Sequence, residues 1–148
     1  MDSTGGSTNA RSPGADDNAS GSVTIMEAFR VIVEAGFKPT NTLEFHWYSG
    51  EEGGLLGSAD VFRNYKSSSK SVVGMLNQDM TGYSPSGTVS VYTDYTDKAL
   101  TSFVTLVARE YTGKEPTTSQ CGYSCSDHGS ARANGYRKSG FGLPLKPH

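Results

Sequence analysis

Helix-like and strand-like segments alternate along this chain, and that order limits the folds open to it more than any other feature. Residues 20–36 and 96–112 place apolar side chains three or four positions apart, which is the spacing of one face of a helix. Residues 43–49 and 72–78 are shorter apolar runs of the kind that form buried strands. This alternation predicts an α/β fold, with a layered mixed sheet and helices on both faces.

Capping and breaking residues set the ends of these elements. Ser20 is placed to cap the first helix, and Gly36 is placed to end it. A further helix is expected over residues 58–66, and a short strand over residues 88–93. Residues 113–135 lack a clear period and are expected to form loop.

Length and composition indicate one globular unit. The 148 residues are enough for one domain with a core, and an irregular tail is expected over residues 137–148. The net charge of -2 gives no sign of nucleic-acid or membrane binding. No run approaches the roughly 20 apolar residues of a membrane helix. Met1 is followed by a Gly/Ser-rich stretch, so no signal peptide is expected.

Acidic side chains stand at three predicted element ends. Glu51 and Glu52 follow the first predicted strand, Asp79 follows the second, and Asp16 and Asp17 open the first helix. In layered α/β sheets, binding sites form beyond the carboxyl ends of the strands. Two adjacent glutamates among glycines fit metal-assisted hydrolysis, with one as ligand and the other as general base. Taken singly, each acid also fits a helix cap or a solvated turn.

The only two cysteines are Cys121 and Cys125, which are four positions apart. This spacing is compatible with a small disulfide loop and with two free thiols, and it differs from the Cys-x-x-Cys of zinc and redox motifs. A disulfide is the favoured interpretation, and it would indicate a secreted parent protein.

Four segments in this order resemble the co-catalytic dizinc aminopeptidases, most closely the secreted leucine aminopeptidases of fungi and bacteria. The segments are Gly14-Ala15-Asp16-Asp17-Asn18-Ala19-Ser20-Gly21, Ser49-Gly50-Glu51-Glu52-Gly53-Gly54-Leu55-Leu56-Gly57-Ser58, Asn77-Gln78-Asp79-Met80 and Cys121-Gly122-Tyr123-Ser124-Cys125-Ser126-Asp127-His128. The resemblance covers roughly residues 2–136. It implies a zinc exopeptidase-like fold, with a partial peptidase domain over residues 1–136 and an incomplete sheet.

The resemblance implies a role for each acid. Asp17 resembles the carboxylate that bridges two zinc ions, while Glu52 and Asp79 resemble ligands to one zinc each. Glu51 resembles the general base that takes a proton from the metal-bound water. The substrates implied are peptides or proteins with a free amino terminus, with no nucleic acid or membrane partner. Release of leucine or another apolar residue is expected.

Three further assignments follow from the resemblance. Asp2 matches an aspartate of a His-x-Asp motif, where it orients the histidine ligand through the other ring nitrogen. Cys121 and Cys125 match a disulfide that shapes the substrate pocket, and Tyr123 lies on the same loop.

The histidines depart from the family pattern. The histidine of the His-x-Asp motif would precede Met1, and the later zinc-binding histidine has no counterpart in residues 137–148. His46 is expected to be held by core or polar partners, His128 matches a position that does not bind zinc, and His148 is terminal. The remaining oxygen ligands suit magnesium, calcium or manganese better than zinc.

Two alternatives therefore stand beside a zinc aminopeptidase. One is a catalytically impaired product that lacks both zinc-binding histidines. The other is a transferase on the same scaffold, similar to a glutaminyl cyclase.

Overall fold

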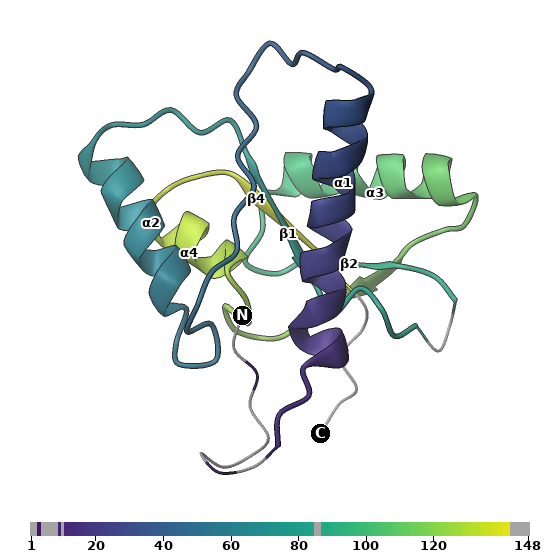
Figure 1. Ribbon diagram of the computed structural model, residues 1–148, viewed down its shortest axis with the longest axis horizontal. Coiled ribbons are helices and arrows are strands. Elements are labelled where there is room, and N and C mark those ends of the chain that lie inside the picture. The colour runs from purple at the N-terminus through teal and green to yellow at the C-terminus, as the bar shows by residue number, and fades with distance from the viewer. Residues whose placement is uncertain (1–2, 4–8, 10, 85–86, 143–148) are drawn as a thin grey trace.

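A four-stranded mixed sheet with helices on both faces organises the chain (Figure 1). The computed structural model describes Ser3, Asn9 and residues 11–84 and 87–142. In chain order the elements are an irregular helical turn η1 (Ala15–Ser20), α1 (Gly21–Glu34), α2 (Leu56–Ser67), β1 (Met75–Asp79), β2 (Ser90–Tyr92), α3 (Lys98–Thr112), β3 (Thr117–Ser119), α4 (His128–Ala133) and β4 (Lys138–Gly142).

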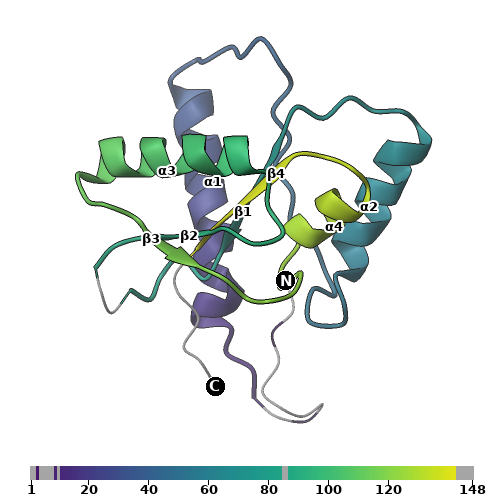
Figure 2. The same ribbon diagram turned by 180° about the vertical axis from the view of Figure 1, so that it is seen from behind.

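The strands lie in the order β1-β4-β2-β3. β1 and β4 are parallel with Met75 opposite Lys138, β2 and β3 are also parallel, and β2 runs antiparallel to β4. Figures 1 and 2 show α1 on one face of this sheet, with α3 and α4 on the other. The predicted fold class, a layered mixed sheet covered by helices on both sides, is therefore confirmed.

The two long predicted helices form as expected. α1 begins directly after Ser20, although the Ser20 side chain makes no capping bond, and Gly36 follows its end with a φ of 63°. α3 begins at Lys98 because the Asp97 side chain accepts a hydrogen bond from the backbone N–H of Leu100 at 2.9 Å. Each helix is followed by a glycine in the left-handed region, where a side chain would be strained.

The prediction of a strand over residues 43–49 is wrong. These residues are extended but pair with no strand among the residues that the structure describes. A strand is stabilised by ladder hydrogen bonds to a neighbour, and the apolar pattern alone does not supply them. The second predicted strand is confirmed as β1, which begins at Met75, three residues later than expected.

Two segments that were predicted to be irregular contain regular elements. β3 and α4 lie within residues 113–135, and β4 lies within residues 137–148. β4 occupies the position between β1 and β2, so its pairing on both sides compensates for a weak local signal. Residues 143–148 of the predicted tail lie outside the described part.

The buried core is small. Among the described residues, the buried apolar side chains are Phe62, Val91, Tyr92, Ala108 and Ala131. Large apolar side chains of α1 and α3 remain exposed, including Met26 at 57% and Phe103 at 59%. Within the described ranges, no helix combines the length and the apolar character that crossing a bilayer requires.

Candidate active site

The loop that contains η1 is bonded to the end of β1, although the two are more than 60 residues apart. The Asp16 carboxylate accepts hydrogen bonds from the backbone N–H groups of Gly82 at 2.8 Å and Tyr83 at 3.1 Å. The Ser20 hydroxyl donates to Asp16 and accepts from the backbone N–H of Thr81 at 2.8 Å. These bonds fix the acidic loop beside the end of β1.

Asn18 makes the central connection between the same two segments. Its amide nitrogen donates to the carbonyl oxygen of Gln78 at 3.0 Å. Its amide oxygen accepts from the backbone N–H groups of Gly21 at 3.0 Å and Met80 at 3.2 Å. One side chain therefore caps the start of α1 and completes the end of β1, which brings Asp17 near Asp79.

The two glutamates lie on a tight turn that leads into α2. The carbonyl oxygen of Glu51 accepts from the backbone N–H groups of Gly54 at 2.9 Å and Leu55 at 2.8 Å. A Cβ atom at Gly57 would lie 2.7 Å from the carbonyl oxygen of Ser49, so only glycine fits there. The glycines around the glutamate pair thus serve the backbone of this turn.

Glu51 sits in a negatively charged environment. Burial, together with the carboxylates of Asp79, Asp127, Glu52 and Asp17, raises the pKa of Glu51 to about 8. Loss of hydration is the largest cause, and the four acids add repulsion in the same direction. The acids that were predicted to share a site are therefore electrostatic neighbours in the folded chain.

Asp79 is held by one hydroxyl group. The Ser126 hydroxyl donates to Asp79 Oδ2 at 2.6 Å and accepts from the side-chain amide of Asn77 at 2.8 Å. Burial raises the pKa of Asp79, which the Ser126 hydrogen bond opposes and Asp127 reinforces. Asp79 Oδ1 is buried with no hydrogen-bond partner among the described residues, which suits a carboxylate that receives a cation.

The acids approach one another without forming a finished metal site. Among the described residues, no group of three His, Cys, Asp or Glu side chains is arranged to hold a metal ion. Asp17 and Glu52 are exposed, while Glu51 and Asp79 are partly buried. The donor chemistry fits a divalent cation, because carboxylate oxygens are suitable ligands, but no histidine of the described ranges completes a metal-binding group with these acids.

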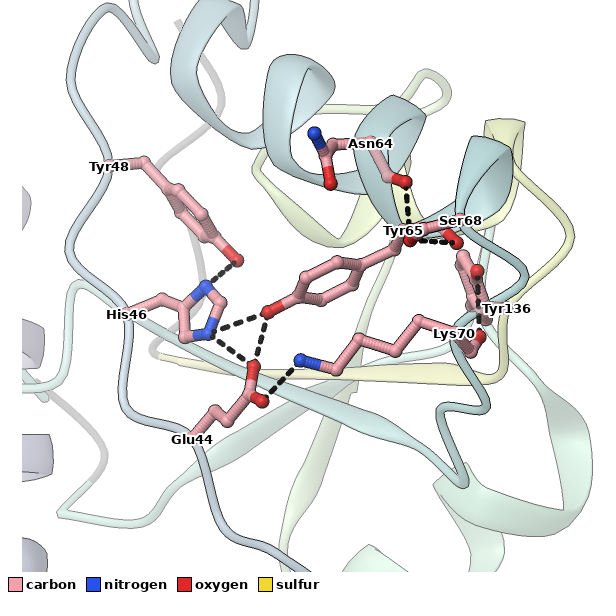
Figure 3. Close-up of polar contacts among 8 residues, drawn as sticks. All are labelled: Glu44, His46, Tyr48, Asn64, Tyr65, Ser68, Lys70 and Tyr136. Atoms are coloured by element: carbon pink, nitrogen blue, oxygen red, sulfur yellow. Dashed lines mark hydrogen bonds and ion pairs between the residues drawn. The ribbon is translucent and has the colours of Figure 1, made fainter.

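The described histidines have other surroundings. His46 Nδ1 lies 3.0 Å from the Tyr48 hydroxyl and His46 Nε2 lies 3.2 Å from Glu44, so it has polar partners as predicted (Figure 3). Glu44 also accepts from the Tyr65 hydroxyl and pairs with the Lys70 ammonium group. His128 is buried, and its ring stacks against Tyr92 with an interplanar angle of 12°. His148 lies outside the described residues.

The predicted disulfide between Cys121 and Cys125 is present. Its loop is anchored by Asp94, whose carboxylate accepts from the backbone N–H groups of Cys121 at 3.0 Å and Gly122 at 2.7 Å. Tyr123 is 63% exposed on this loop, and its contact with a substrate stays a prediction. The loop therefore presents an exposed aromatic ring on a covalently closed support.

Sequence reasoning missed the residues that position the acids. Asp16, Asn18 and Ser126 hold the ends of β1 and η1 together, and Asp127 adds charge beside Glu51. All four occur inside the quoted motifs, so their polar character at element ends was the available signal. The prediction for Asp2 lies outside the described residues.

Comparison with known proteins gives a consistent result. The profile described as "Peptidase family M28" matches residues 1–146. A probable leucine aminopeptidase of Arthroderma otae is 54% identical over 131 residues, which cover 86% of this chain and 36% of that protein. A probable aminopeptidase of Saccharomyces cerevisiae is 55% identical, over 84% of this chain and 35% of that protein.

A solved structure agrees with the sequence relatives. The LapA aminopeptidase of Legionella pneumophila superposes with a TM-score of 0.80 at 36% identity, over 90% of this chain and 37% of that chain. The chain thus spans about a third of the length of the relatives it matches.

Proposed function

The chain belongs to peptidase family M28, and from that premise we propose that it is the carboxylate-bearing part of a zinc aminopeptidase. The proposed reaction removes leucine or another apolar residue from the amino terminus of a peptide or protein by hydrolysis. The relatives described above are named as aminopeptidases. Their names favour this activity over a glutaminyl cyclase-like transferase. The catalytically impaired product is tested below by turnover and retained zinc.

One observation carries the proposal, namely the environment of Glu51. Four carboxylates and burial raise the pKa of this side chain to about 8. Glu51 thus lies beside the proposed ligands Glu52 and Asp79, where a carboxylate that is not itself a ligand can take a proton from water. Glu51 is therefore the residue assigned to take the proton from the attacking water and to deliver it to the leaving amine.

The metal assignment rests on the donor atoms around Glu51. Asp17, Glu52 and Asp79 are the residues that would hold the zinc ions. The buried Asp79 Oδ1 atom, which has no hydrogen-bond partner in the described part, supports its assignment. When bound, zinc supplies polarisation of the peptide carbonyl and a more acidic water. Ser126 orients the Asp79 carboxylate through the bond to Oδ2.

The same charges favour the proposed substrate. A free amino terminus carries a positive charge, which Asp127, an acid near Glu51 that is not among the proposed zinc ligands, attracts. An acylated terminus lacks that charge, so Asp127 favours exopeptidase substrates over blocked ones. The exposed ring of Tyr123 offers an apolar surface for the first side chain.

The activity is tested with a leucine chromogenic amide and added zinc. We expect turnover by the 148-residue chain and a loss of at least about 100-fold in kcat for Glu51→Gln, since general base catalysis contributes that much. The matched control is Glu110→Gln, at an exposed position on α3, which should retain activity.

Two further readouts separate the alternatives. Metal analysis after dialysis should give about two zinc ions per chain for a two-metal site. No turnover together with no retained zinc would contradict the proposal for this chain and favour the impaired product. Formation of a cyclised amino terminus instead of free leucine would favour the transferase.

We also propose that the protein acts outside the cell. The closed Cys121–Cys125 disulfide supports this, because such bonds persist in oxidising compartments. Detection of the protein in cell lysate and not in the culture medium would contradict it.

A further inference from the structure

One short segment, residues 93–95 after β2, contacts the start of the disulfide loop, residues 121–125. Just before the loop, the side-chain amide of Gln120 donates to the hydroxyl of Thr93 at 3.2 Å. The backbone N–H of Thr93 donates to the carbonyl oxygen of Ser119, the last residue of β3, at 3.0 Å. The chain therefore enters the loop beside a partner that continues past the end of β2.

Asp94 and Tyr95 bind both backbone polar groups of Gly122. The Asp94 Oδ2 atom accepts from the backbone N–H groups of Cys121 at 3.0 Å and Gly122 at 2.7 Å. The Tyr95 hydroxyl donates to the carbonyl oxygen of Gly122 at 3.2 Å. An ionised acceptor makes stronger hydrogen bonds than a neutral one, so Asp94 provides the stronger contact. The peptide groups on both sides of Gly122 are therefore held from outside the loop.

Tyr95 is supported in turn by α4. The guanidinium group of Arg132, a residue of α4, lies over the Tyr95 ring at 4.8 Å from its centroid. A cation over an aromatic face is attracted to it, which restricts the ring. Tyr95 thus connects the disulfide loop to α4 without involving either cysteine.

The other end of the loop is also held by noncovalent contacts. Ser126 follows Cys125 directly, and its hydroxyl donates to Asp79 and accepts from the side chain of Asn77 in β1. Hydrogen bonds to neighbouring segments therefore fix the chain at both ends of the loop. The disulfide joins two points that these contacts already place.

The contacts at Gly122 determine how Tyr123 leaves the loop. Gly122 has a φ of 82°, in the left-handed region that favours glycine. Because its N–H and its carbonyl group are both held, the peptide plane from which Tyr123 starts has a fixed orientation. Tyr123 is 63% exposed, so the position of its ring depends mainly on this backbone.

We propose that Asp94 and Tyr95 are positioning residues for Tyr123, on which they act through Gly122, and that they keep the disulfide loop in shape when its disulfide is reduced. Only the effect on substrates rests on the proposed function, in which Tyr123 lies beside the first side chain. The shape of the loop is tested without any substrate.

Hydrogen exchange at the backbone amides of Cys121 and Gly122 measures the contact with Asp94 in the 148-residue chain. In Asp94→Ala, with the disulfide intact, both amides should exchange at least about tenfold faster than in the parent, since their acceptor is lost. Asp94→Asn keeps an oxygen acceptor without its charge and should have a smaller effect. The control is Asp60→Ala, at an exposed position on α2, which should leave both amides unchanged.

Reduction separates the contribution of the disulfide from that of Asp94. A phosphine converts the bond to two thiols, and in the reduced parent the same amides should exchange within about threefold of their rate in the oxidised parent. In reduced Asp94→Ala they should exchange faster than in the reduced parent or in the oxidised variant, because both constraints on the loop are then absent.

Kinetics with the leucine chromogenic amide test the effect on Tyr123. Asp94→Ala should raise KM at least about fivefold and keep kcat within about threefold of the parent, because Tyr123 is assigned to the first side chain and not to the reacting atoms. Tyr95→Phe removes the hydroxyl but keeps the ring under Arg132, so it should raise KM less. A parent chain without turnover would count against the proposed function, and the exchange rates would still decide the shape of the loop.

Circular dichroism and urea unfolding establish that each variant folds. If Asp94→Ala does not fold, Tyr95→Phe takes its place and should speed exchange at the Gly122 amide of the reduced chain at least about threefold. Unchanged exchange in the folded variant would overturn the positioning role. Loss of protection at both amides on reduction of the parent would show that the disulfide alone shapes the loop, and would overturn the proposal as well.

Discussion

The two edges of β1 are organised in opposite ways. One edge pairs with β4 along all five residues, from Met75 opposite Lys138 to Asp79 opposite Gly142. The other edge borders a cavity, called the slot, which is lined by residues 40–48 on one side and by residues 70–79 on the other. There Asn18 donates a hydrogen bond to the carbonyl oxygen of Gln78 near the end of the strand. β1 is therefore held on the β4 side by strand pairing along its whole length. On the slot side it is held by Asn18 near its carboxyl end.

This difference explains why the acids lie near one another without forming a metal-binding group among the described residues. Asp79 is fixed by β4 and Ser126, and Asp17 is brought near it by the bonds of Asn18. Glu51 and Glu52 are fixed by their own turn on the far side of the slot. The spacing across the slot thus decides whether the two pairs of acids converge, and among the described residues no group of three does.

Asn18→Ala is expected to lower the free energy of unfolding more than the other substitutions proposed here. It removes the side chain whose hydrogen bonds hold the slot-side edge of β1 to the start of α1. Three hydrogen bonds are lost, to Gln78, Gly21 and Met80. With each bond contributing about 0.5–1.5 kcal/mol, the free energy of unfolding should fall by about 2–4 kcal/mol. Urea unfolding followed by circular dichroism measures this loss.

The control for Asn18→Ala is Asn64→Ala, at an exposed position of α2. A surface change of this kind should alter the free energy of unfolding by no more than about 0.5 kcal/mol. Equal effects of the two substitutions would show that the slot-side edge does not depend on Asn18.

Ser126→Ala tests the end of β1 that belongs to the fixed edge. It removes the hydrogen bond to Asp79 Oδ2, which leaves a partly buried carboxylate less well compensated. The pKa of Asp79 should rise further, and the free energy of unfolding at pH 7 should fall by about 1–3 kcal/mol. Urea unfolding measures the stability, and carboxyl NMR titration measures the pKa.

Ser67→Ala, at an exposed position on α2, is the control for this hydroxyl group. If Ser126→Ala leaves both the Asp79 titration and the stability unchanged, then β4 pairing alone fixes the carboxylate.

Much of the sheet side that carries α3, β1 and Asp79 was predictable from the sequence. The helical spacing of residues 96–112 gave α3, and the apolar run at residues 72–78 gave β1 within three residues. Asp79 at the end of that run was correctly identified as a strand-end acid. These features are local, because a helix period or a buried run needs no knowledge of the neighbours.

The failures concern features that depend on neighbours. Residues 43–49 have the composition of a buried strand but pair with none in the described part, whereas residues 138–142 have little strand signal and still form β4. Asn18 was also missed as an organiser, because its bonds reach residues about 60 positions away. Pairing of this kind is decided by tertiary contacts and not by local propensity.

Glu51→Gln should remove a carboxylate whose charge is disfavoured by burial and by the neighbouring acids. The pKa of Glu51 is about 8 in the folded chain, against an ordinary value of 4.5 for glutamate. Between these values the unfolded chain loses its proton first, so stability falls as pH rises from about 4.5 to 8. In chelator, Glu51→Gln should be more stable than the parent at pH 8 by about 1–2 kcal/mol, with no difference below pH 4.

Thermal unfolding across this pH range tests the Glu51 prediction, with Glu110→Gln as control. A parent chain whose stability is flat from pH 4.5 to 8, relative to Glu51→Gln, would show that neither burial nor the neighbouring acids disfavour the Glu51 carboxylate.

Glu44→Gln tests the opposite end of the slot and should have the smallest effect. Hydrogen bonds from Lys70 and Tyr65 lower the pKa of Glu44 to about 2, so its ionised form is favoured by folding. The stabilisation is present above pH 4.5 and is lost as pH falls toward 2. Because Glu44 is partly exposed, Glu44→Gln should lower the free energy of unfolding by at most about 1 kcal/mol at pH 7.

The exposed pair Asp60–Arg63 supplies the control, Asp60→Asn, which should change the free energy of unfolding less than Glu44→Gln does. A larger loss in Asp60→Asn would show that Glu44 does not hold residues 43–48 to the start of β1.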